Sequence, residues 1–283
     1  MEKHKNVSNT AIAITYLYEI FKTEVAEVRD HVRKNLIVGT REEELYKGTM
    51  ILYSELISNP DFMFIGINPG AKFFQQTGIK YRPEELDPDD EFEYTAAAQY
   101  GHDYALARQT RTAFERTRYK DSLSRSVKSN LFYTATSSQK DLCDLLDLLN
   151  TKFNVNYYEK SALWTRCLID LINPKVIICE GKWVVEKLGQ YYGVDPQWVN
   201  EIAHFQIENG IQVLGYKRRY SDMRNIDDFA TALNSLELFN LNSLHETIEH
   251  GRGAGEVGAA AGEDPQPKAG HDAGIAAGRT RLV

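Results

Sequence analysis

The stretch Asp61-Phe62-Met63-Phe64-Ile65-Gly66-Ile67-Asn68-Pro69-Gly70 decides the fold class. Its first seven residues form a short, nearly continuous apolar run, which is typical of a strand buried on both faces of a sheet. Asn68-Pro69-Gly70 ends the run with turn-forming residues, because proline presets φ and glycine tolerates a positive φ. The stretch therefore predicts a buried strand that ends in a tight turn, where a ligand can approach the backbone closely.

Three further apolar runs have the same character, and helical patterns separate them. The runs cover residues 127–133, 176–179 and 211–214. The intervening stripes at helical spacing are Leu142, Leu145, Leu146 and Leu149; Trp164, Cys167, Leu168 and Leu171; and Val184, Val185 and Leu188. Alternating strands and helices require right-handed crossovers and a parallel sheet. The sequence predicts an α/β fold of three layers (α/β/α), with helices on both faces of a central, mainly parallel four-stranded sheet.

The regions on either side of this alternating body have different compositions. Apolar residues at helical spacing predict N-terminal helices at about 9–34 and 42–58, so that 1–243 forms one α/β domain with helices in its first 58 residues. From Gly251 to Val283, Gly and Ala supply 16 of 33 residues and no aromatic residue occurs. We expect residues 244–283 to be a disordered tail, and their foreign composition is consistent with a translated vector sequence.

Composition and charge restrict the class of protein. The N-terminus leads into no signal-like apolar run, and no run approaches the ~20 apolar residues of a membrane span, so we expect a soluble, cytoplasmic protein. Only three cysteines occur, at spacings that fit neither a disulfide framework nor a metal knuckle, and we expect three buried thiols and no metal. The net charge is −7, so nucleic-acid contact requires a local basic patch.

Polar residues follow the predicted strands, where parallel sheets gather their chemistry. Asn68 follows the first strand, either as a functional amide or as part of an ordinary turn. Glu180 follows the third, either as a base or as a cap of the next helix, and we favour a cap because an acid there stabilises the helix by ~0.3–1 kcal/mol. Lys217, Arg218 and Arg219 follow the fourth, in a phosphate-binding loop or a solvated one.

A second basic segment precedes the second strand. Between Arg108 and Lys128, seven basic residues stand against two acidic ones, whereas Glu84 to Glu93 contains seven acids and no base. The basic segment either converges with the loop at 217–219 on one edge of the sheet or forms the solvated face of a helix.

The segment Phe64-Ile65-Gly66-Ile67-Asn68-Pro69-Gly70 resembles the first motif of the uracil-DNA glycosylase superfamily, in the Asn-containing form of mismatch-specific and thymine-DNA glycosylases. Lys128-Ser129-Asn130-Leu131 is similar to the segment that often carries an Asn on the second strand. Pro174 to Lys182 is similar to the third strand and the turn after it. The resemblance spans residues 61 to about 225. The chain departs from the superfamily in lacking a His-Pro-Ser-like loop after its last strand and the four cysteines of the iron–sulfur branches.

The resemblance implies a DNA-repair hydrolase that flips out a uracil, or a mismatched or damaged base, and cleaves its N-glycosidic bond without a cofactor. It implies that Asn68 holds the attacking water. It further implies two sets of binding residues, which are Gly66, Ile67, Pro69, Gly70, Phe73, Phe74 and Asn130 for the base, and Lys217, Arg218, Arg219 and Ser221 for the DNA. The implied partner is uracil- or mismatch-containing DNA, bound by a monomer.

Two alternatives remain open at this level. One is a glycosylase-like module that binds nucleic acid without hydrolysis. The other is a nucleotide or small-molecule hydrolase in which Glu180 acts as base. The place of Asn130 also depends on where the second strand ends. If that strand ends near Leu131, Asn130 lies at the sheet edge; if it runs to Ala135, Thr134 or Thr136 takes that place.

Overall fold

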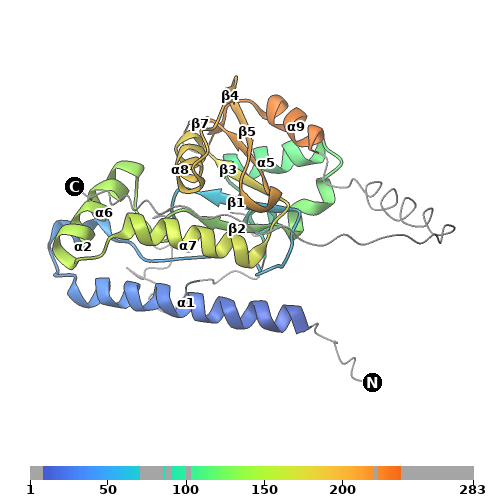
Figure 1. The fold of residues 1–283 in the computed structure, drawn as a ribbon. Helices are drawn as coiled ribbons and strands as arrows, with labels where there is room; N and C mark the ends of the chain where they lie inside the picture. Colours follow the sequence, from blue (N-terminus) through green and yellow to red (C-terminus); the bar gives the residue numbers. More distant parts are fainter. Residues whose placement is uncertain (1–8, 71–85, 87–90, 100–102, 220–221, 237–283) are drawn as a thin grey trace, which may run out of the picture. The chain divides into compact units, whose positions relative to one another are not determined.

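The computed structural model describes residues 9–70, 86, 91–99, 103–219 and 222–236. All of these residues belong to the unit Met1–Leu238, which is an α/β structure (Figure 1). The predicted tail at 244–283 and most of the acidic stretch at 84–93 lie outside the described residues.

The central sheet has six strands in the order β2-β1-β3-β6-β5-β4. The strands are β1 (Phe62–Gly66), β2 (Val127–Asn130), β3 (Val176–Glu180), β4 (Trp198–Val199), β5 (Ile202–Gln206) and β6 (Gln212–Tyr216). The four predicted strands are β1, β2, β3 and β6, and neighbours among them pair in parallel as expected. The prediction of only four strands is wrong, because β5 pairs antiparallel with β6, and β4 with β5. This hairpin was missed because its strands are short and mostly not buried, and so lack a continuous apolar run.

The helices lie before, between and after the strands in the sequence. They are α1 (Asn9–Asn35), α2 (Arg41–Leu45), α4 (Glu93–Gln99), α5 (Ala105–Glu115), α6 (Gln139–Phe153), α7 (Tyr157–Ile172), α8 (Lys182–Tyr192) and α9 (Ile226–Ser235), with 3-10 turns η1 (Lys120–Arg125) and η2 (Glu208–Gly210). The predicted helix at 9–34 and the three predicted crossover helices are confirmed as α1, α6, α7 and α8. Ser138 and Asn156 cap α6 and α7 by accepting backbone N–H groups, so local capping also fixes where these helices begin.

The predicted helix at 42–58 is wrong beyond its first turn. Only α2 is helical, and the chain then runs beside the outer strand β2. The N–H groups of Met50 and Tyr53 donate to the carbonyls of Tyr133 and Lys128 at 2.8 and 2.9 Å. The backbone groups of an edge strand need hydrogen-bond partners. Pairing with this segment outweighs the preference for a helix that the spacing of its apolar residues indicates.

Alternate strand residues enter two separate hydrophobic clusters. Met63, Ile65 and Ile177 join a cluster that includes residues of α1, α6, α7 and α8. Phe62, Phe64 and other alternate residues join a second cluster with residues of α4, α5 and α9. Since successive side chains of a strand point to opposite faces, each face of the sheet has its own apolar core. This arrangement leaves the ends of the strands available for polar groups.

A second sheet consists of two short strands, β7 and β8. Its strands, Arg218–Arg219 and Asp222–Met223, pair antiparallel. Backbone pairing therefore holds Arg218 and Arg219 of the basic loop predicted after the fourth strand.

Gly215 sets how closely α8 packs on β6. A Cβ atom at this position would lie 2.1 Å from Cγ2 of Val185. We predict that Gly215→Ala lowers the free energy of unfolding by ~1–3 kcal/mol, because overpacking forces the helix away from the strand. Chemical denaturation measures the change. Gly70→Ala is the control, since nothing lies within 4 Å of its would-be Cβ, and an equal loss in both variants contradicts the packing argument.

Candidate functional site

The last residues of the four parallel strands form one row across the sheet. Gly66 is in register with Asn130, and Glu180 with Tyr216. The pairing of Ile65 with Cys179 places Gly66 beside Glu180 in the same way. Residues in register point to the same face, so Asn130, Gly66, Glu180 and Tyr216, hereafter the edge row, share one face at the carboxyl ends of the strands. This is the edge where the sequence predicts a site.

Gly66 leaves the middle of the edge row to the side chains of its neighbours. A Cβ at this position would lie 2.4 Å from Oδ1 of Asn130 and 3.2 Å from Oε2 of Glu180. The two polar side chains thus approach the same backbone position from β2 and β3. Only glycine leaves them this space.

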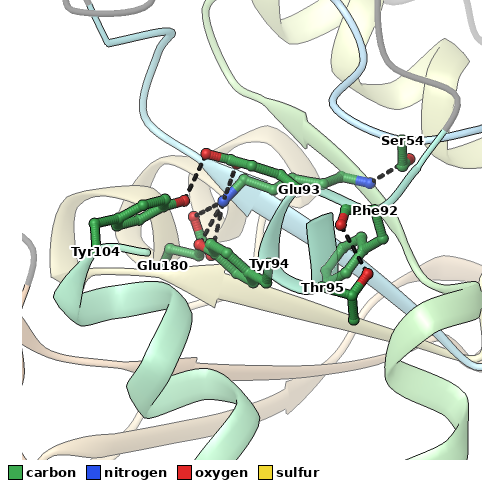
Figure 2. Close-up of polar contacts among 8 residues, drawn as sticks. Ser54, Phe92, Glu93, Tyr94, Thr95, Tyr104 and Glu180 are labelled. Carbon is green, nitrogen blue, oxygen red and sulfur yellow. Dashed lines mark hydrogen bonds and ion pairs between the residues drawn. The ribbon is translucent and has the colours of Figure 1, made fainter. Parts of the chain in front are cut away.

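A polar cluster that includes Glu180 of the edge row consists of Glu93, Tyr94, Tyr104, Lys128 and Glu180. Tyr94, Lys128 and Glu180 are buried, and Glu93 and Tyr104 are half-buried. Figure 2 labels all of these residues except Lys128. Nζ of Lys128 lies 3.1 Å from Oε2 of Glu180 and 3.2 Å from Oε2 of Glu93. The same ammonium lies 3.7 Å from the ring centroid of Tyr94. The hydroxyl of Tyr94 donates to Oε1 of Glu180, and that of Tyr104 donates to Oε1 of Glu93 at 2.5 Å. Two carboxylates therefore share one ammonium and two phenols.

Burial raises the pKa of both tyrosines of this cluster. Glu180 is 2% exposed and Lys128 6%, so each charge depends on the other for compensation. Burial and the adjacent charge of Glu180 raise the pKa of Tyr94 well above its usual value. Both tyrosines are consequently neutral hydrogen-bond donors, and both oxygens of Glu180 accept hydrogen bonds within the cluster.

Arg218 adds a second positive charge from the other side of the row. Its half-buried side chain lies along Gly181, whose would-be Cβ is 3.4 Å from Cγ and Nε of Arg218. Burial lowers the pKa of Arg218, but the charge of Glu180 outweighs this effect and raises it overall. The guanidinium makes no hydrogen bond or ion pair with any described residue. Its N–H groups are therefore available to an anion at the sheet edge.

Asn130 lies at the sheet edge, because β2 ends at this residue. Of the two possibilities for the second strand, the one that ends near Leu131 is confirmed. The side chain is only 6% exposed, yet its amide makes no hydrogen bond to any described residue. Because an amide carries both an acceptor and donors, this group is suited to a ligand that offers a donor and an acceptor side by side.

Asn68 follows β1 and lies half-buried in the turn. Its Nδ2 donates to the carbonyls of Pro69 and Thr134 and to Oγ1 of Thr136 at 3.1, 3.2 and 3.0 Å. Because these partners include two carbonyls, the orientation of the amide is fixed and Oδ1 points elsewhere. Oδ1 accepts no hydrogen bond from the described part of the chain. Asn68 thus ties the turn to the segment after β2 and keeps one acceptor available.

The other predicted site residues differ in their positions. Ile67 is half-buried against the first cluster, Pro69 is buried, and Gly70 forms a bridge with Thr136. Phe73, Phe74 and Ser221 lie outside the described residues. Nζ of Lys217 donates to the carbonyl of Asn200 at 3.2 Å and lies over the ring of Trp198. Arg219 is exposed. Lys217 therefore contacts the β4–β5 hairpin, and only Arg218 of the basic loop approaches the edge row.

The basic segment at 108–128 forms no shared patch with Arg218 among the described residues. Arg111 pairs with Asp103 at 2.7 Å, Arg116 pairs with Asp227, and Arg118 donates to the carbonyl of Leu236. These cations fasten α5 and the following turn to neighbouring segments. Lys128 alone reaches the site.

Two expectations about single residues are wrong. Glu180 does not cap α8, whose N-cap is Gly181 and has no side-chain cap hydrogen bond; the carboxylate instead pairs with buried Lys128. The three cysteines are not all buried, since Cys167 is exposed and Cys143 half-buried. The role of Lys128 was also missed. Positions 128 and 130 share a strand face, so a lysine two residues before Asn130 was the available signal.

Comparison of the sequence with protein-family models finds no match, nor does comparison with curated proteins. Within the described ranges, no group of three His, Cys, Asp or Glu residues could hold a metal ion. No helix in this part of the chain is long and apolar enough to cross a membrane.

The buried pairing of Lys128 predicts a large effect on stability. Lys128→Met should lower the free energy of unfolding by ~3–5 kcal/mol, because it leaves buried Glu180 without its cation. The control is Lys182→Met, whose pair with Glu186 is exposed and should be worth less than ~1 kcal/mol. Adding Glu180→Gln to Lys128→Met should recover part of the loss in a double-mutant cycle. Equal effects of the two single lysine substitutions would contradict the assignment.

Proposed function

We propose that this protein is a DNA glycosylase that hydrolyses the N-glycosidic bond of a flipped-out uracil, or of a mismatched or damaged base. The observation that carries the proposal is the amide of Asn130, which is nearly buried at the end of β2 beside Gly66 and makes no hydrogen bond to a described residue. A base edge offers the adjacent donor and acceptor that such an amide requires. The resemblance of residues 64–70 to the glycosylase first motif supports the same reaction. We further infer that the helices around the sheet form the three-layer α/β/α body of that superfamily.

Asn68 supplies a means of holding the water nucleophile. With Nδ2 bound to three acceptors, Oδ1 remains to accept a hydrogen bond from water. An amide cannot remove a proton, so this residue contributes orientation and not general-base catalysis. The departing base and the DNA phosphates must then stabilise the developing positive charge on the sugar. We therefore expect slow turnover, because Asn68 cannot remove a proton from the attacking water.

Arg218 supplies the cation that a nucleic-acid substrate needs at this edge. The molecule is acidic overall, and most of the basic residues of the 108–128 segment are used internally. The available guanidinium beside Gly181 can hold a phosphate of the flipped nucleotide or of its neighbour. Arg219, which is exposed next to it, can add a second backbone contact. DNA is the proposed partner, and the reaction uses groups of the chain without a cofactor.

The alternative of a binding module without hydrolysis uses the same amide and the same guanidinium. The hydrogen bonds of Asn68 support this alternative, because they stabilise the turn whether or not the protein catalyses hydrolysis. The hydrolase with Glu180 as base fits less well, because both carboxylate oxygens are engaged by Lys128 and Tyr94 at 2% exposure. Release of a free base from an oligonucleotide separates hydrolysis from binding.

Asn130→Ala tests the proposed function directly. We expect it to lower the single-turnover rate of base release by at least ~10²-fold from duplexes that contain uracil, hypoxanthine or a G·T mismatch. Its stability should hardly change, because the amide has no partner to lose within the described residues. Thr151→Ala on the exposed face of α6 is the control. Release at the parental rate by Asn130→Ala, or no release from any duplex by the parent, would contradict the proposal.

Asn68→Ala separates the two duties of the turn amide. We expect base release to fall to the background rate, together with a stability loss of ~1 kcal/mol because three hydrogen bonds disappear. Thr136→Val removes one of these bonds without touching Oδ1. It should therefore lose stability and keep base release, as measured by unfolding and single-turnover assays. Equal rate losses in both variants would assign Asn68 a structural role only.

A further inference from the structure

A basic hollow lies on the C-terminal half of α1, outside the strand-end site. Arg29, Asp30, Arg33 and Lys34 line it, and its volume is about 390 Å³. Since a water molecule occupies about 30 Å³ in the liquid, the hollow has room for a phosphate group together with several waters. Three cations and one carboxylate give its lining a net positive charge.

The charges of the hollow are incompletely paired. Nε of Arg29 lies 2.8 Å from Oδ1 of Asp30, and the side chain of Arg29 is only 10% exposed. Arg33 has no ion pair within the described part of the chain, and its Nε is buried without a hydrogen-bond partner. Arg29 and Arg33 stand four residues apart on one helix face, where like charges repel. Of these two partly buried guanidiniums only that of Arg29 has a carboxylate partner among the described residues, so the pair is suited to an added anion.

The helix end explains only part of this arrangement. Arg33 and Lys34 lie in the last turn of α1, where cations interact favourably with the free carbonyls. That role requires exposed positive charge near the axis. It does not require a half-buried Arg33 with an unsatisfied Nε, nor a second guanidinium one turn earlier. The excess positive charge of the hollow needs another reason.

Short contacts connect the hollow to the turn at Asn68. Burial raises the pKa of Tyr46 to about 12, while the hydrogen bond from Thr49 and the charges of Arg33 and Arg29 oppose the rise, so both guanidiniums lie near this phenol. Tyr46 and Thr49 share a hydrogen bond of 2.9 Å, and Thr49 bridges to Thr134. The carbonyl of Thr134 accepts from Asn68. The hollow is thus four residue contacts from the proposed water-holding amide.

We propose that the hollow formed by Arg29, Arg33 and Lys34 is a binding site for a phosphate group. Arginine recognises phosphate oxygens through its planar set of N–H donors, and Lys34 adds a point charge at the rim. The phosphate belongs to a nucleic-acid backbone or to a free phosphorylated molecule. Only the first of these sources rests on the proposed function, and the site itself does not depend on base hydrolysis.

Arg33→Gln is the decisive variant, tested with inorganic phosphate as probe. Calorimetric titration at constant ionic strength should show at least about tenfold weaker phosphate binding than in the parent. In phosphate-free buffer the variant should unfold at the same temperature as the parent or higher, because it relieves repulsion with Arg29. Arg166→Gln is the control, since this exposed arginine has its own partner in Glu208. Absence of phosphate binding in the parent, or equal binding by Arg33→Gln, would overturn the proposal.

Duplex DNA distinguishes the two sources of phosphate. If the backbone occupies the hollow, Arg33→Gln should reduce the slope of log affinity against log salt by about one. An unchanged slope alongside weakened phosphate binding would retain the site and assign it to a free phosphorylated molecule. Base release by the parent is measured separately, so a failure of the glycosylase proposal is distinguishable from a failure of the phosphate site.

Discussion

The missing side chain at Gly66 is the constraint on which the strand-end site depends. The amide of Asn130 and the carboxylate of Glu180 both approach the space that a Cβ at Gly66 would fill. Parallel pairing places these groups in one row, and the glycine between them allows that row to be polar. A larger residue at position 66 would push the Asn130 side chain aside. The apolar strand and the glycine at its end are therefore inseparable parts of one motif.

The ion pair between Glu180 and Lys128 limits which chemistry the edge row can perform. Glu180 is a candidate base because it lies at the end of a parallel strand. Its oxygens, however, accept hydrogen bonds from Lys128 and Tyr94. A buried carboxylate compensated in this way costs much less than an unpaired one, and it gains rigidity at the expense of reactivity. The negative charge of Glu180 also stabilises the charged form of Arg218 nearby. Chemistry at this edge must rely on neutral amides, on water and on the substrate itself.

Much of this arrangement was readable from the sequence, for definite reasons. The strands β1 and β3 are buried on both faces, so their apolar runs are nearly continuous, whereas in β2 only Val127 is apolar and the apolar residues Leu131 to Tyr133 follow its end. The helix at 42–58 and the β4–β5 hairpin were misjudged because pairing with neighbouring strands, and not local preference, determines both segments. The pair of Lys128 with Glu180 joins residues 52 positions apart. No local pattern reveals such a partner, although the strand-end positions of Glu180 and Asn130 were predictable.

The most direct test of the account is whether a base contacts the amide of Asn130. The side-chain N–H signals of Asn130, assigned by their loss in Asn130→Asp, can be followed by ¹⁵N–¹H NMR during titration with a duplex that carries 2′-fluoro-2′-deoxyuridine, whose glycosidic bond resists hydrolysis. The account predicts that these signals shift on binding and that the shift is absent with a matched duplex of normal base pairs. Binding of the modified duplex with unmoved Asn130 signals would contradict the central claim.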